Sequence, residues 1–428
     1  MKQTFSLIVA LWLMTIASAV AQPNEGATPH RTRLIPYPTA QLAHEGSLAK
    51  NRYMQPIEEW IEVDGVLRGE FTYPFSWVER QIYIRIEGWR EPYEVWINGK
   101  YKGQSKNGFA PMELNITKLS KEDKNVVELR LKGGDETRPI ESFERGTAPP
   151  KADNISQPRV RVRDVAWRTT IEQSGVVNAD FNVIMHNETL GAKSAELFYE
   201  IYLNDTLRLT GGRLNVALGM HGVDTMRFGT PIPDTMLWSR ERPTRLSLRL
   251  KNRIAGRDVE FYDFNLGMRQ VEFNNGSYNI NRASDRIEWH ALSPRSTIAD
   301  MEEILDRGIY AVRFTAGYVS DELLDFCDAN GIYAAVTAPI NSSAMGSSRK
   351  RNGNPSNNPA WREEYTERTL QMIHTTKRHP SVIAYFLADD SANGICLYES
   401  YLAAKAITTT PIFYLDGGNE WNSDRLEK

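Results

Sequence analysis

The sequence predicts a multidomain β plus α/β protein, in which two all-β modules precede a segment of alternating strands and helices. Residues 55–150 contain stretches that alternate apolar and polar side chains with period two, as in Gln81–Glu87 (QIYIRIE), which is typical of half-buried strands. Residues 160–265 repeat this pattern. In residues 266–428 predicted strands alternate with predicted helices, which indicates βαβ units with parallel strands.

Composition and charge narrow the class of protein. Hydrophobic residues make up 41% and charged residues 25% of the chain, which is typical of a soluble globular protein. With 51 Lys and Arg against 54 Asp and Glu, there is no overall basic field, so nucleic acid is not an expected partner. Two cysteines exclude a disulfide scaffold, and we expect Cys327 and Cys396 to be free and buried, with a disulfide between them left open. The motifs include no metal-ligand cluster and no phosphate loop, so no metal and no cofactor are expected.

The first 21 residues read as a cleavable signal peptide. Lys2 precedes an apolar run at residues 7–16, and Ala19-Val20-Ala21 forms a small-residue cleavage site. The run is shorter than the roughly 20 residues of a membrane span, although a buried N-terminal helix is an alternative. No cysteine follows it to carry an acyl anchor, so we expect a periplasmic or secreted protein. Residues 22–54 are polar and rich in proline and are expected to form a linker or a wrapping N-terminal arm.

The modules differ in their local signals. In the first, Tyr93–Ile97 is followed by Asn98-Gly99, a strong two-residue hairpin turn. The second, of about 105 residues, has the length and strand spacing of an immunoglobulin-like sandwich. In the third segment, helices are expected at residues 298–307, 321–329, 361–376 and 397–407, and strands at residues 309–314, 332–336, 382–387 and 411–415.

Several local motifs occur in a characteristic order. They are residues 95–100 (VWINGK), 108–111 (GFAP), 237–239 (LWS), 267–269 (GMR), 311–313 (AVR), 326–333 (FCDANGIY), 378–383 (RHPSVI) and 411–418 (PIFYLDGG). In this order the chain resembles glycoside hydrolase family 2, the family of β-galactosidases and β-glucuronidases. The resemblance implies a jelly-roll sugar-binding-like domain at 55–150, an immunoglobulin-like β-sandwich at 160–265, and an incomplete (β/α)8 TIM-type barrel at 266–428 with about five of eight strands.

The resemblance also implies the catalytic chemistry. A retaining glycosidase uses two carboxyl groups about 5–5.5 Å apart, an acid that protonates the leaving oxygen and an ionised nucleophile. In the family the acid/base is a Glu that follows an Asn directly after strand four; here residues 386–391 (FLADDS) place Asp389 at the Asn and Asp390 at the Glu. Asp390 is therefore the catalytic candidate and Asp389 a substrate-binding candidate, with a solvated acidic loop end as the alternative. The family's nucleophile lies on strand seven, beyond the last residue of this sequence.

Three further residues are substrate-binding candidates. Arg313 ends the AVR motif, and its alternative is a salt bridge inside the barrel. Trp361 is expected to stack on a sugar ring or, alternatively, to pack at the start of a helix. Tyr414 belongs to the PIFYLDGG motif. Two positions depart from the family, because Ala316 and Thr337 stand where it has His and Glu.

Two functions fit this pattern. The first is an exported glycosidase that hydrolyses β-linked O-glycosides in an oligosaccharide or polysaccharide. The second is a catalytically inactive relative, which binds carbohydrate or serves in assembly, and it explains the changed site positions. An open half-barrel exposes strand edges, so a homodimer, the N-terminal arm or a separately encoded partner is expected to cover them.

Overall fold

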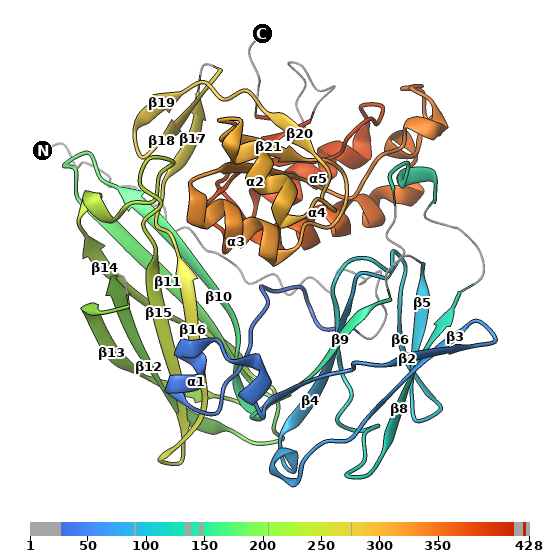
Figure 1. Cartoon of the computed structure of the whole chain (residues 1–428), viewed down its shortest axis with the longest axis vertical. Helices are drawn as coiled ribbons and strands as arrows, with labels where there is room; N and C mark the ends of the chain where they lie inside the picture. Colours follow the sequence, from blue (N-terminus) through green and yellow to red (C-terminus); the bar gives the residue numbers. More distant parts are fainter. Residues whose placement is uncertain are drawn as a thin grey trace, which may run out of the picture.

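The computed structural model describes residues 27–89, 91–132, 138–144, 149–203, 205–274, 276–414 and 423–424. The predicted signal peptide lies outside these residues. Figure 1 shows three bodies: a β module in blue and teal, a sandwich in green and yellow, and an α/β body in orange and red. The multidomain β plus α/β organisation predicted from the sequence is thus confirmed.

The first module consists of two antiparallel sheets with strand orders β1-β9-β4-β7 and β2-β3-β8-β5-β6. Its strands are β1 (Met54–Pro56), β2 (Trp60–Val63), β3 (Val66–Phe71), β4 (Gln81–Glu87), β5 (Tyr93–Ile97), β6 (Lys100–Ser105), β7 (Met112–Asn115), β8 (Asn125–Leu131) and β9 (Lys151–Gln157). Alternate side chains of both sheets fill a common core that includes Ile84, Val95 and Leu129. The predicted boundary at residue 150 is wrong, because β9 pairs with both β1 and β4 and extends the module to Gln157.

The second module is a sandwich of two antiparallel sheets with orders β10-β11-β14 and β13-β12-β15-β16. Its strands are β10 (Val160–Ile171), β11 (Val177–Asn187), β12 (Lys193–Leu203), β13 (Leu207–Leu218), β14 (Val223–Ile232), β15 (Leu246–Ile254) and β16 (Arg257–Leu266). Inward-facing residues such as Val183, Leu197 and Leu248 are fully buried between the sheets. This arrangement agrees with the sandwich expected from strand spacing.

The third body contains a parallel sheet in the order β20-β21-β22-β23-β24. Its strands are β20 (His290–Leu292), β21 (Ala311–Phe314), β22 (Tyr333–Thr337), β23 (Val382–Phe386) and β24 (Ile412–Phe413), and its helices are α2 (Ile298–Asp306), α3 (Asp321–Asn330), α4 (Arg362–Thr376) and α5 (Ile395–Lys405). The four predicted helices and four predicted strands all form. Apolar residues on one face of the sheet, including Val312 and Tyr385, share a core with residues of the helices, such as Leu324 and Ile373.

Part of the opposite, inner face of the sheet is covered by a small antiparallel sheet that the sequence did not predict. It consists of β17 (Val271–Asn274), β18 (Ser277–Ile280) and β19 (Ala283–Asp285). Tyr278 and Phe273 pack edge-on against Phe413, at ring-centroid distances of 5.9 and 4.9 Å. The inner face is therefore filled by aromatic rings over part of its surface.

The N-terminal arm wraps the modules together. Arg31 donates to Glu113 in the first module (2.6 Å), and Thr32 donates to Asp164 in the second (2.8 Å). Tyr37 forms a β-bridge with Phe261 before the arm enters α1 (Ala40–Glu45). Figure 1 shows α1 beside β16.

At the β24 edge of the parallel sheet, the backbone N–H of Asp424 donates to the Ile412 carbonyl at 2.7 Å.

Two further expectations concern cysteines and membranes. Cys327 and Cys396 are both buried and free, as predicted. Within the residues that the structure describes, no helix combines the length and apolar character needed to cross a membrane.

Candidate active site

The carboxyl ends of three neighbouring strands bring four of the singled-out positions together. Arg313 on β21 donates through Nη1 to the Asp389 carboxylate (2.5 Å) and to the hydroxyl of Thr337 on β22 (3.1 Å). The backbone N–H of Ala316 donates to the second carboxylate oxygen of Asp389 at 2.6 Å. Asp389 follows β23, so this network connects β21, β22 and β23 where their loops begin.

Strand alternation explains why these side chains meet. Val312 and Phe314 pack toward the helices, which leaves Arg313 between them on the inner face. Arg313 pairs in parallel register with Ala335, a small buried residue that leaves room beside it. The Arg313 and Asp389 side chains are 12% and 13% exposed, so their ion pair is largely shielded from water. The predicted alternative for Arg313, a salt bridge inside the barrel, is confirmed.

The two adjacent aspartates lie in different environments. Asp389 is nearly buried in the network, whereas the side chain of Asp390 is exposed. The Asp390 backbone is fixed nonetheless, because its carbonyl oxygen accepts from the N–H of Ser342 at 2.9 Å. Ser342 Oγ lies 2.6 Å from Ser391 Oγ and donates to Asn354 Oδ1 (2.9 Å). This buried network connects the loop after β22 to the loop after β23. It holds the Asp390 backbone near the carboxyl end of β23.

A segment from outside the α/β body contacts the loop after β22, at the same edge of the sheet. Residues 138–144 leave the first module, and Glu141 forms a parallel β-bridge with Asn341, next to Ser342. Ser142 N–H donates to the Asn341 carbonyl (2.9 Å), and Asn341 N–H donates to the Ile140 carbonyl (2.8 Å). In Figure 1 this teal segment lies against the orange loops of the α/β body. The candidate site is therefore bordered by two modules.

A buried arginine anchors that segment. Arg368 on α4 donates to Glu141, to Glu364 (2.9 Å) and to the Pro339 carbonyl (2.7 Å). The Arg368 and Glu141 side chains are both 0% exposed. Sequence reasoning missed this pair. The spacing of Glu364 and Arg368 is a helix signal for a local pair, but nothing local links Arg368 with a residue 227 positions away.

The other two candidates lie on the helix side of the sheet. Trp361 is half-buried at the start of α4 and packs against the helix-side core, in agreement with its predicted alternative. Tyr414 follows β24, is 1% exposed and belongs to the same core. Neither side chain contributes to the Arg313–Asp389 network.

A separate cluster has the composition of a metal site but is explained by ion pairing. Ligand atoms of Asp325, Asp328 and His379 lie within 4.8 Å of one another. Arg378 supplies positive charge there, at 3.1 Å from Asp325 and 3.4 Å from Asp321. Burial and Arg378 both oppose protonation of His379, but the carboxylates of Asp328 and Asp321 outweigh them and hold its pKa above the ordinary value. The cluster thus connects α3 to the segment before β23.

Comparison with known proteins identifies relatives of this architecture. The sequence model described as "Glycosyl hydrolases family 2, TIM barrel domain" matches residues 280–425. A β-galactosidase of Priestia megaterium is 24% identical over 399 residues, which cover 87% of this chain and 37% of that protein. The β-galactosidase large subunit of Lactobacillus acidophilus is 25% identical over 369 residues, or 76% of this chain and 54% of that one. The chain therefore spans between about a third and about half of the length of these relatives.

Solved structures share the fold. A β-glucuronidase of Bacteroides uniformis superimposes with a TM-score of 0.68 at 16% identity, covering 82% of this chain and 46% of that one. A putative β-galactosidase of Bacteroides fragilis gives a TM-score of 0.71 at 16% identity, covering 84% and 57% of the two chains. The arrangement of the three modules is thus shared with much longer proteins.

Proposed function

Because this chain is a divergent member of glycoside hydrolase family 2, we propose that it binds β-linked carbohydrate at the carboxyl ends of β21, β22 and β23. We propose further that it hydrolyses β-O-glycosides there, with Asp390 as general acid and base. The sugar is expected to enter over the inner face, beside the segment of residues 138–144.

One observation carries the proposal, namely the separation of the two aspartates. Both oxygens of Asp389 accept hydrogen bonds from protein groups, Arg313 and the Ala316 N–H. Asp390 is left as the exposed carboxyl group, on a backbone that Ser342 fixes. An accessible carboxyl group on a held backbone at the carboxyl end of β23 can transfer a proton to a glycosidic oxygen.

The proposed reaction needs a second carboxylate. In a retaining mechanism Asp390 gives its proton to the leaving oxygen while the nucleophile attacks the anomeric carbon, and Asp390 then takes a proton from the incoming water. The five strands of the described sheet do not include the seventh, on which the family carries the nucleophile.

The test is turnover of aryl β-galactosides, β-glucuronides, β-glucosides and β-mannosides by the protein and by Asp390→Asn. Asp306→Asn is the matched control, because Asp306 is an exposed carboxylate in the last position of α2. The proposal expects Asp390→Asn to lose about 100-fold or more in kcat/KM, the usual contribution of general acid catalysis, and Asp306→Asn to lose nothing. Equal activity of both variants removes Asp390 from the acid role.

The second candidate function is carbohydrate binding or assembly without turnover. The closed Arg313–Asp389 pair favours it, since these groups satisfy each other without a ligand. Ala316 and Thr337, in place of the family's His and Glu, favour it as well. Saturable binding of a β-linked oligosaccharide, combined with no turnover of the panel, would select this function.

Export and assembly are further parts of the proposal. The features of residues 1–21 support export, and N-terminal sequencing of the protein from its native host should then begin at Gln22. A start at Met1 would contradict export. A homodimer or a separately encoded partner that covers the sheet edges is tested by sedimentation of the native protein. A monomer at all concentrations, with no co-purifying chain, would reject both forms of cover.

A further inference from the structure

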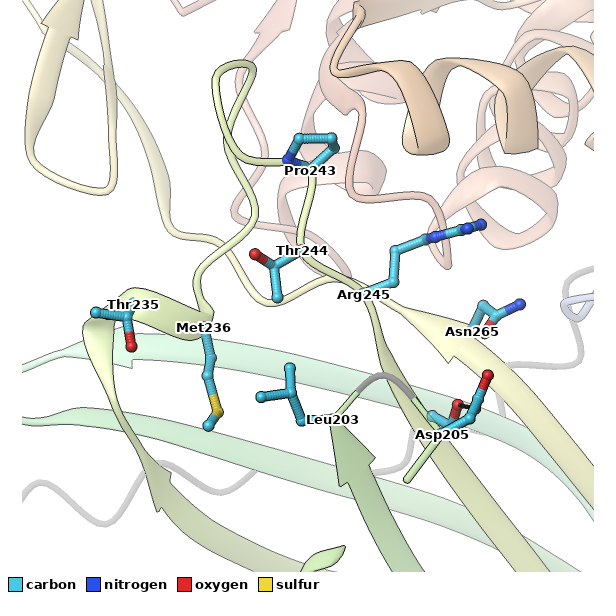
Figure 2. A pocket seen from close by; sticks show the side chains of 9 residues that line it. Leu203, Asp205, Thr235, Met236, Pro243, Thr244, Arg245 and Asn265 are labelled. Atoms are coloured by element: carbon cyan, nitrogen blue, oxygen red, sulfur yellow. Dashed lines mark hydrogen bonds between the residues drawn. The ribbon is translucent and has the colours of Figure 1, made fainter. Parts of the chain in front are cut away.

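A solvent-open hollow lies at one end of the sandwich, where the sheet β13-β12-β15-β16 meets the loops between strands. It has a volume of about 560 Å³, within the roughly 300–1,000 Å³ that ligand pockets occupy. The residues that line it come from the ends of β12 and β16, from the start of β15 and from the loops between strands: Leu203, Asp205, Thr235, Met236, Pro243, Thr244, Arg245, Ser247 and Asn265. Figure 2 shows this hollow from close by.

The base of the hollow is apolar and preformed. Leu203 and Met236 are half-buried and pack against the core of the sandwich, and Pro243 lies above them. Their positions are set by the sandwich itself, so the apolar base exists before any ligand arrives. An apolar base suits the C–H groups of a sugar ring better than it suits an ion.

Polar groups surround the apolar base, and the charged ones lie on one side of it. Figure 2 shows Asn265 and Asp205 close together on the side away from Met236, with Arg245 on the same side but apart from them, and Thr235 beside Met236. Asp205 is held in place because Ser247 Oγ donates to its carboxylate, whereas Arg245 and Asn265 are exposed. Asp205 thus offers a held acceptor, and Arg245 and Asn265 offer donors that can adjust their position. Sugar hydroxyl groups suit both, because each hydroxyl can donate one hydrogen bond and accept others.

The charges of this side nearly balance. Of the residues that line the hollow, Arg245 supplies one guanidinium group and Asp205 one carboxylate. Outside the lining, Arg249 lies 3.5 Å from Asp205 and 3.0 Å from Asp263, and His44 lies 3.1 Å from Asp263. This balance favours a neutral ligand over an anion or a cation.

We propose that this hollow is a second carbohydrate-binding site, which takes a neutral oligosaccharide and is separate from the site at Asp390. Its open mouth admits a unit within a longer chain. The assignment does not depend on turnover at Asp390, so a failure of one proposal leaves the other testable.

The methyl group of Met236 allows a local test in the intact protein. The protein is labelled with 13C-methyl methionine, the Met236 resonance is assigned with Met236→Leu, and β-1,4-linked tetrasaccharides of galactose, glucose and mannose are added. The proposal expects a saturable shift of this resonance with at least one of them. Arg245→Ala should weaken the affinity by about tenfold or more, as when a charged donor to the ligand is lost.

The control variant is Arg257→Ala. Arg257 is exposed at the opposite end of β16 from Asn265, about 26 Å away at roughly 3.3 Å per residue. It should bind like the wild type, and so should Asp390→Asn. An unmoved Met236 resonance, a shift produced by phosphate alone, or an equal affinity in Arg245→Ala would overturn the assignment.

Discussion

The buried Arg368–Glu141 pair gives the sharpest prediction about how the modules are held together. Replacing Arg368 with methionine keeps much of the side-chain volume but removes three donated contacts, to Glu141, Glu364 and the Pro339 carbonyl. Glu141, with a side chain that is 0% exposed, then loses an ion-pair partner inside the protein. Removing one partner of a buried ion pair costs about 3–5 kcal/mol, so we expect a loss of this size in the free energy of unfolding.

The assay is urea unfolding followed by tryptophan fluorescence, with attention to the transition that releases the α/β body. Arg307→Met is the matched control. Arg307 is 56% exposed, and its ion pair with Glu303 is long, at 3.9 Å, so the pair should contribute little to stability. It should change the stability by less than about 0.5 kcal/mol. The double variant Arg368→Met/Glu141→Gln should regain part of the loss, since the two residues are in direct contact and the buried charge of Glu141 is gone. A loss below about 0.5 kcal/mol in Arg368→Met would refute the reasoning.

Two more predictions concern pH and backbone geometry. The pKa of His379 is raised in the folded protein, so its stabilising contribution is complete below the unfolded pKa of about 6.5 and disappears as pH rises through the folded value. Thermal unfolding should therefore show His379→Asn losing more stability at pH 6 than at pH 9, and the reverse order would contradict the pairing with Asp328. Gly331 has φ +67°, and a Cβ there would lie 2.2 Å from the Arg240 carbonyl oxygen, whereas Gly308 has φ +73° with open space. In urea unfolding, Gly308→Ala should lose about 1–2 kcal/mol and Gly331→Ala more, and equal losses would contradict the close contact.

Much of the fold follows from local patterns. The helices near residues 298–307 and 361–376 and the strand near 382–387 were predicted because periodicity and end signals are local properties. The strand β9 was missed because its residues, KADNISQ, show no clear alternation and become a strand only by pairing with β1 and β4. The sheet β17–β19 was missed for the same reason, since its short strands are stabilised by aromatic packing on the inner face.

The neighbourhood of the candidate residues was predictable from the sequence, but their contacts were not. Motifs placed Arg313 and Asp389 at neighbouring strand ends, because the ends of parallel strands meet at one edge, and the structure shows these two side chains in contact. The role of Asp390 stays a prediction. Asp389 rather than Asp390 turns inward because it accepts from the Ala316 N–H and from Arg313, which are 73 and 76 residues away. The local sequence around the two aspartates does not indicate which of them makes these contacts. The direction of Tyr414 was also not predicted. Ile412 and Tyr414 face the helices and Phe413 faces the inner side, so strand alternation turns Tyr414 away from the candidate site.

If Asp390 acts as a general acid, the activity lost in its absence must depend on how much the leaving group needs a proton. Asp390→Asn is compared with the wild type on two β-glycosides of the sugar preferred in the panel, one with a dinitrophenyl and one with a methyl leaving group. Dinitrophenol has a low pKa, so its phenolate departs without protonation. Methanol has a high pKa, so the methyl glycoside needs a proton from the enzyme as its bond breaks. We expect a loss in kcat/KM of about 100-fold or more on the methyl glycoside and a much smaller loss on the dinitrophenyl glycoside. Equal losses on both substrates, or no loss on either, would contradict it.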